Sequence, residues 1–259
     1  MTLPLYDPKD VIRVHDASFE YALRVQRAVG RQSERRTANS VAGAALMTPS
    51  HETICLHRAT RELCGAGWAF AAPIMLRVML ETMCSVAVIA NSLRPDVASF
   101  KYFYSYTKED LSDPAVDPRR AAAETGANIE THLAQMTTDD RQLGKEYLQA
   151  PKAGNFWYNP EFAGPTAIIK EYAIAEVLDL YRMLSMAAHG GFLGMRVFRD
   201  DPDLLDVNPR KDLRATGFAL VSSSRLLAEA TRPRVVFEAL RDGGYDDVMK
   251  MIQALKPIG

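Results

Sequence analysis

The apolar residues of this chain recur mostly at spacings of three and four, which is the pattern of helices packed along one face. The longest apolar stretch, residues 68–92, is interrupted by one polar stripe of Arg77, Glu81 and Ser85. At about 100° per residue, steps of four return to nearly the same helical face, so these three side chains are expected to stack. A helix that is hydrophobic all round is normally the buried centre of a helical protein, so the pattern predicts charged groups in the core. Such groups need partners.

Further helices follow from the same periodicity and from capping signals. Asp7-Pro8 predicts a helix start, because an aspartate N-cap and a proline at the first helical position commonly open a helix. We expect Gly30 to weaken or end this helix and Ser50 to cap the next one. The remaining expected features are a turn or loosened segment at Gly65 and Gly67, a kink or first turn at Pro73, and an aromatic-rich element over 97–106 that is packed from several sides. Further helices are expected over 117–136, 138–148, 167–189, 208–227 and 234–252, the last interrupted at Gly243-Gly244.

Nothing in the sequence indicates strands or a second domain. No alternating strand pattern of useful length, internal repeat or linker-like change of composition occurs. The sequence therefore predicts an all-α protein, a single-domain bundle of about eight helices over residues 1–259.

The longest expected loop, residues 151–165, carries three adjacent aromatic residues, Phe156, Trp157 and Tyr158. Such a loop either packs onto the core or forms a lid over a ligand. We favour core packing, because burying large aromatic area is a general stabiliser.

Composition says more about the cellular location of the protein than about its function. The chain has 259 residues and a formal net charge of -1, so no global attraction to nucleic acid or acidic membranes is expected. Its three cysteines show no CxxC spacing and the N-terminus shows no signal peptide, which predicts reduced thiols in a cytoplasmic protein. Residues 68–90 are about long enough to span a membrane, but Arg77 and Glu81 near the middle argue against it.

Several common chemistries have no support in the sequence. It contains no GxGxxG, no P-loop and no GxSxG nucleophile elbow. None of the five histidines follows a glutamate by three residues, as di-iron bundles require, and His51 and His57 are poorly spaced for a shared metal. We therefore expect no metal and no cofactor.

The second distinctive stretch is the expected helix end at residues 181–189. Arg182 and His189 are seven residues apart, which places them within about 20° of each other around the axis, with Ser185 between them and Tyr181 at the edge. In a chemical interpretation the arginine holds a phosphate and the histidine moves a proton. In a structural interpretation His189 caps the helix, and Arg182 pairs with a carboxylate such as Glu81.

These residues carry resemblances to two known protein families. The pattern Ala-x-x-x-Leu-Arg-x-x-x-Glu, residues 72–81, with the later Tyr-x-x-x-Ser-x-x-x-His, residues 181–189, resembles an uncharacterised family of bacterial all-helical proteins. The resemblance covers roughly residues 50–190 and implies a helical fold, with no known activity. The positions that it marks are Arg77, Glu81, Tyr181, Ser185 and His189.

Separately, the pair Arg182 and His189 resembles the Arg and His motif of HEPN-domain ribonucleases, which are common in bacterial toxin and defence systems. This resemblance implies metal-independent cleavage by attack of the RNA 2′-hydroxyl, with both residues at the scissile phosphate. It also implies a homodimer, because the motif usually lies at a dimer interface.

Two functional hypotheses follow. In the first, the protein cleaves RNA in a defence or stress role. Tyr181, Arg182, Ser185 and His189 then form the catalytic group, Arg77 and Glu81 bind the substrate, and a basic ridge of Arg24, Arg27, Arg31 and Arg35 guides the RNA backbone. In the second, the protein is a non-enzymatic helical module for a small molecule or a protein partner. A buried or half-buried polar cluster then fixes two core helices, and its expected members are Arg77, Glu81, Tyr181, Arg182, Ser185 and His189. The basic ridge is equally compatible with an ordinary solvated helix surface.

Overall fold

The computed structural model describes residues 3–35, 41–112, 128–150, 157–158, 160–172, 175–188, 212–237, 240 and 243–258. Within these residues the chain forms helices and no strands, which confirms the all-α class. The helical segments in this described part are slightly more numerous than expected.

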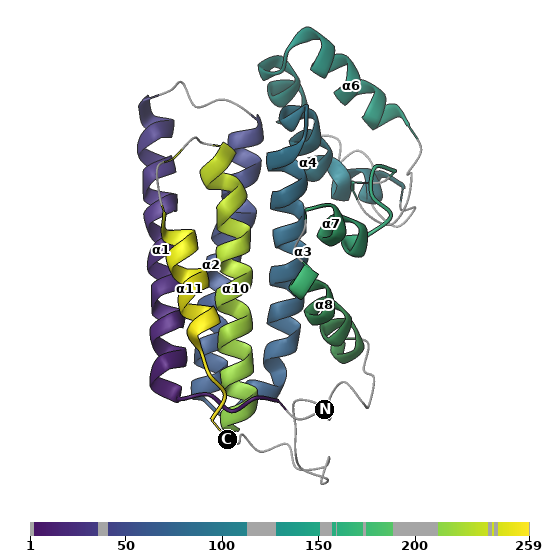
Figure 1. Cartoon of the computed structure of the whole chain (residues 1–259). Helices are drawn as coiled ribbons and strands as arrows, with labels where there is room; N and C mark the ends of the chain where they lie inside the picture. Colours follow the sequence, from purple (N-terminus) through teal and green to yellow (C-terminus); the bar gives the residue numbers. More distant parts are fainter. Residues whose placement is uncertain are drawn as a thin grey trace.

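Four long helices form the main bundle, and Figure 1 shows them side by side. They are α1 (Pro8–Arg35), α2 (Val41–Gly65), α3 (Ala72–Asn91) and α10 (Leu213–Phe237). Helix α10 contacts each of the other three, and the last helix, α11 (Gly244–Ala254), packs on α1 and α10. A short 3-10 turn, η1 (Ala69–Ala71), leads into α3.

The other helices pack beside this bundle. Helices α4 (Pro95–Ser112) and α6 (Thr138–Gln149) lie together with a helical stretch at 128–135, around a core that includes Phe100, Tyr104 and Leu133. Helices α7 (Pro165–Glu171) and α8 (Ala175–Ala188) contact each other and α3, on the side of α3 away from α1 (Figure 1).

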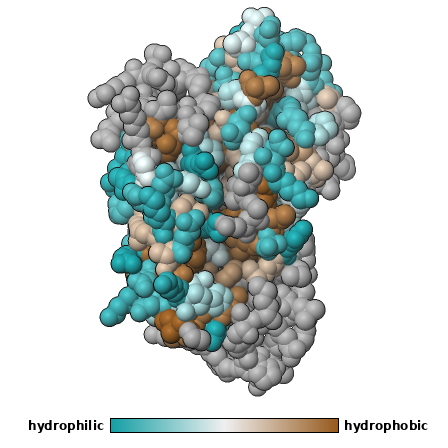
Figure 2. All heavy atoms as spheres, viewed as in Figure 1, coloured by the Kyte–Doolittle hydropathy of each residue, from teal (hydrophilic) through white to brown (hydrophobic). Residues whose placement is uncertain are grey.

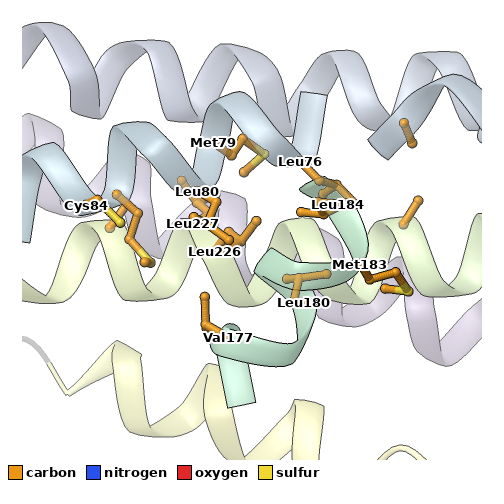
Figure 3. Packing of buried hydrophobic residues seen from close by; sticks show 14 of the residues in the cluster. Leu76, Met79, Leu80, Cys84, Val177, Leu180, Met183, Leu184, Leu226 and Leu227 are labelled. Atoms are coloured by element: carbon orange, nitrogen blue, oxygen red, sulfur yellow. The ribbon is translucent and has the colours of Figure 1, made fainter. Parts of the chain in front are cut away.

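The main core lies where α3, α8 and α10 meet. Figure 3 shows Leu76 and Leu80 of α3, Leu184 of α8 and Leu226 of α10 gathered in this space. The stretch Ala69–Asn91 is long and apolar enough to cross a membrane, yet 72% of its most apolar window is buried inside the protein. Contact with neighbouring helices therefore accounts for its apolar character.

The two described ends of the chain are tied to the same end of the bundle (Figure 1). The Ile258 backbone N–H donates to the Leu5 carbonyl at 2.7 Å, and Arg214 Nη1 of α10 donates to the Leu3 carbonyl at 2.7 Å. The segments before α1 and after α11 are thus joined to each other and to α10.

Several predicted helix boundaries were wrong. Helix α1 does not end at Gly30, which was one of the two expected effects of this residue, but continues to Arg35. Ser50 does not cap α2 but lies inside it, next to Pro49, and its Oγ donates to the Leu46 carbonyl at 2.6 Å. The helix expected over 167–189 is divided, because α7 ends at Glu171 and α8 begins at Ala175.

Of the remaining boundaries, one was confirmed, one was wrong and two lie outside the described residues. Pro73 lies in the first turn of α3, one of the two expected positions. Helix α10 continues past the expected end at Leu227 and includes Arg234, which was assigned to the last helix. The expected helix starts at Asp117-Pro118 and Asn208-Pro209 lie outside the described residues.

The described surface shown in Figure 2 is mostly hydrophilic, with smaller apolar areas between. The large apolar side chains that are exposed come from separate places in the chain, namely Ile12, Ile74, Leu93, Leu213 and Ile258.

Candidate functional site

The polar stripe of α3 forms as predicted. Arg77, Glu81 and Ser85 lie one turn apart on a helix whose other faces are largely buried. Arg77 Nε donates to Glu81 Oε1 at 2.7 Å, and Ser85 Oγ donates to the Glu81 backbone carbonyl at 3.3 Å. The stripe is thus hydrogen-bonded along its own length.

Two residues of α8 complete the cluster from the other side. Arg77 Nη1 donates to Ser185 Oγ, and Arg77 Nη2 donates to Tyr181 Oη at 3.1 Å. The guanidinium carbon also lies 4.1 Å from the centre of the Tyr181 ring, which is a cation–π distance. We call Arg77, Glu81, Tyr181 and Ser185 the Arg77 cluster; it joins α3 to α8.

The Arg77 cluster is half-buried, and its guanidinium stays charged. The Arg77 side chain is 14% exposed, whereas the Glu81 side chain is 46% exposed. Burial alone would lower the pKa of Arg77, but hydrogen bonds to Tyr181 and Glu81 and the Glu81 charge outweigh it, so the pKa of Arg77 is raised. The cluster therefore presents a fixed guanidinium beside a carboxylate that solvent can reach.

The aromatic loop packs against the same region. Trp157 Nε1 donates to Ser85 Oγ at 3.3 Å, so the indole touches the end of the α3 stripe. Tyr158 is 4% exposed, and burial raises the pKa of its hydroxyl, with the Cys84, Glu81 and Tyr181 charges adding to the rise. For these two residues core packing, the favoured alternative, is confirmed; Phe156 lies outside the described residues.

Arg182 does not belong to the cluster, and this part of the prediction was wrong. Its side chain is 64% exposed and Nη1 pairs with Asp179 at 3.2 Å, not with Glu81. The reason lies in the apolar stripe of α8: Val177, Leu180 and Leu184 face the core, and Arg182 lies about 200° around the axis from Leu180. Tyr181 and Ser185 instead share the face that meets α3.

The other candidate residues lie apart from this region or outside the described residues. His189 is not among the described residues, and the side chains of Arg31 and Arg35 are not described either. Arg24 and Arg27 are exposed on α1, a helix that contacts α2, α10 and α11. The structure therefore gathers four of the ten predicted site residues: Arg77, Glu81, Tyr181 and Ser185.

A second polar cluster, which the sequence analysis missed, joins α1 to α2. The rings of His15 and His57 stack with centres 3.7 Å apart and an interplanar angle of 10°. Each Nε2 lies 3.2 Å from the backbone carbonyl of the other histidine, and Ser18 Oγ donates to the His15 carbonyl at 2.8 Å. A sequence signal existed, because His15 lies on the apolar face of α1, four residues after Val11.

Both histidines are neutral at physiological pH. They are 2% and 0% exposed, and burial lowers the pKa of His57 to about 3, with the nearby His15 and Arg61 contributing to the decrease. The pKa of His15 is lowered too, mainly by burial. Among the described residues, no group of three or more His, Cys, Asp or Glu side chains is placed to hold a metal ion.

Comparisons with known proteins add no family. No family model matches the chain, and no curated protein or solved structure matches it. The class of protein that its own residues define is an all-α bundle with a half-buried arginine cluster between two helices. The functional argument therefore rests on the chemistry of that cluster.

Proposed function

We propose that the protein is a non-enzymatic helical module that binds a small molecule at the Arg77 cluster. The observation that supports this is the guanidinium of Arg77, held by three side chains from two helices. A group fixed in this way loses little conformational freedom when a ligand arrives, so binding costs less entropy than at a mobile side chain. Glu81 gives the site an edge that solvent reaches, since its side chain is 46% exposed.

The test uses the indole N–H signal of Trp157 in a two-dimensional NMR spectrum. The chain has two tryptophans, so the signal is assigned with a Trp68→Phe variant. Because Trp157 Nε1 donates to Ser85 Oγ beside the cluster, a bound fragment should shift this signal. We expect members of a polar fragment library to shift it in the wild type and in the matched surface variant Arg58→Gln, which loses an exposed arginine paired with Glu62 on α2.

Two further variants show whether the shift comes from the cluster. Arg77→Gln removes the guanidinium and should abolish the shift, provided that circular dichroism shows a folded helical protein. Ser185→Ala keeps the guanidinium and should weaken fragment binding severalfold. The proposal is wrong if no fragment shifts the Trp157 signal, or if folded Arg77→Gln responds like the wild type.

The second candidate function is metal-independent cleavage of RNA, and one observation favours it. Arg182 is 64% exposed and its ion pair is with Asp179, itself 83% exposed. Exposed pairs of this kind contribute little to stability, so an RNA phosphate readily replaces the aspartate. The sequence spacing of Arg182 and His189 supplies the matching proton-transfer group.

This candidate is tested by incubating the purified protein with mixed RNA in EDTA. Cleavage by the wild type, lost in both Arg182→Gln and His189→Ala at unchanged melting temperature, would support it. Binding should weaken steeply with salt, and sedimentation should show the homodimer that such an active site uses. An intact RNA substrate after incubation with the wild type eliminates this function and leaves the binding module.

A further inference from the structure

The hydrogen-bonding groups of the Arg77 cluster specify a class of ligand. We infer that the ligand is a small acid that also carries a hydroxyl or an ammonium group. This inference rests on the proposed binding function and goes further, because it assigns a partner to each group that the cluster presents.

The acid group follows from the donors. A guanidinium carries five N–H donors, and within the described residues Arg77 uses three of them on Glu81, Ser185 and Tyr181, which leaves two, one on each Nη. Ser185 Oγ and Tyr181 Oη accept from Arg77, so each hydroxyl keeps its own proton to donate. Charge-assisted donors grouped in one cluster suit the oxygens of a carboxylate or a phosphate.

The second group follows from Glu81. Its Oε1 accepts from Arg77 Nε, which leaves Oε2 as an acceptor on a half-exposed side chain. A plain acid bound to Arg77 would meet the negative charge of Glu81 with nothing to offset it. A hydroxyl or an ammonium group next to the acid would donate to Glu81 and remove that conflict.

The charge of the cluster agrees with this pairing. Arg77 and Glu81 carry opposite formal charges, so together they form a neutral pair in a half-buried place. A zwitterion or a hydroxy acid matches both members, whereas a simple anion matches only one. Mismatched charges in partly desolvated sites weaken binding, so discrimination between such ligands is expected.

The experiment compares three acids of the same size: alanine, lactate and propionate. They differ only in bearing an ammonium group, a hydroxyl group or neither at the carbon next to the carboxylate. Dissociation constants are measured by following the Trp157 indole signal, whose Nε1 donates to Ser85. We expect alanine and lactate to bind at least about tenfold more tightly than propionate, as one hydrogen bond to a charged group predicts.

Glu81→Gln is the variant that tests the assignment. Glutamine keeps an oxygen that accepts from Arg77 Nε but carries no charge, so the preference for alanine over propionate should disappear. Arg58→Gln, the matched surface control, loses an exposed arginine paired with Glu62 on α2 and should keep the preference of the wild type.

The possible outcomes separate this inference from the function on which it rests. Equal affinity for all three acids, or a preference unchanged in Glu81→Gln, overturns the ligand class while leaving a binding site in place. If neither the three acids nor the polar fragment library shifts the Trp157 signal, the binding function itself is wrong.

Discussion

At the scale of single residues, the three cysteines differ in whether reagents can reach them. Cys55 is exposed, while Cys64 and Cys84 are buried, and burial raises the pKa of each of these two thiols to about 12. Because the thiolate is the reactive form, native protein at neutral pH should take up one equivalent of iodoacetamide per chain, and unfolded protein three. Mass spectrometry measures the uptake.

Cys55→Ser is the control, since its native form should take up no iodoacetamide. Uptake of two or more equivalents by the native wild type would contradict the packing of α2 and α3 that buries Cys64 and Cys84.

The two arginines near α8 should differ in their effect on stability. Arg77→Gln removes hydrogen bonds that join α3 to α8 and should lower the free energy of unfolding by about 1–3 kcal/mol. Arg182→Gln removes only an exposed ion pair with Asp179, so a change within about 0.5 kcal/mol is expected. Urea denaturation followed by circular dichroism measures both, and equal effects would contradict the assignment.

These two arginines also show how far the sequence defined the site. The Arg77 stripe was predictable, because charged residues at steps of four on an apolar helix must find partners. The partners Tyr181 and Ser185 on α8 were predictable as candidates together with Arg182. Motif spacing alone does not show which of the three face α3, because the apolar stripe of α8 decides that. The buried Leu180 and Leu184 set the orientation of α8 about its axis, so Arg182 faces solvent.

At the scale of elements, the end of α2 depends on a glycine in the left-handed region. Gly67 has φ 86°, its N–H donates to the Cys64 carbonyl at 3.1 Å, and the Trp68 N–H donates to the Leu63 carbonyl at 2.8 Å. These two bonds form a Schellman motif, which satisfies the last carbonyls of the helix. The turn expected at Gly65 and Gly67 is therefore confirmed, with Gly67 in the strained position.

Gly67→Ala should lower the free energy of unfolding by about 1–2 kcal/mol, because a Cβ disfavours this backbone conformation. Gly65→Ala is the matched control: a Cβ built there meets nothing within 4 Å, and Gly65 is helical. Its stability should be unchanged or slightly raised. Thermal melting of both variants tests the contrast, and similar losses in the two would show that the backbone conformation is not the cause.

The same scale explains which helix boundaries sequence could predict. Periodic apolar positions place helices well, as in α1 and α3, because the pattern reflects the buried face itself. Boundaries depend on single residues whose local preference tertiary packing overrides. Pro49 lies inside α2, and the nearby Ser50 and Thr53 hydroxyls donate to backbone carbonyls of the same helix. Ser50, which is expected to cap the start of a helix, therefore lies in the helix interior.

At the scale of the whole molecule, the buried pair of His15 and His57 couples the packing of α1 on α2 to pH. The neutral rings stack and exchange hydrogen bonds with each other's backbone carbonyls. Next to them Asp16 forms an ion pair with Arg61, so an aspartate of α1 and an arginine of α2 lie close to the two rings. A proton added to either ring would place a charge in the core beside the other histidine.

This arrangement predicts that acid destabilises the protein before its carboxylates titrate. The pKa of His57 is lowered from 6.5 to about 3 in the folded chain, so between these values the unfolded chain binds more protons. The contribution of His57 to the free energy of unfolding is therefore complete above pH 6.5 and is lost as the pH falls toward 3. The expected slope is about 1.4 kcal/mol per pH unit for each proton, and His15, whose pKa is also lowered, adds to it.

Urea denaturation at pH values from 7 down to 4.5 measures this slope in the wild type and in two variants. His57→Phe keeps a ring that can stack on His15 but cannot titrate, so its slope should be smaller by about one proton even if its stability at pH 7 is lower. His51→Gln, an exposed histidine on the same helix, should keep the wild-type slope. If His57→Phe kept the full slope, the acid sensitivity would belong to other groups, and the stacked pair would be a packing feature without a role in the pH response.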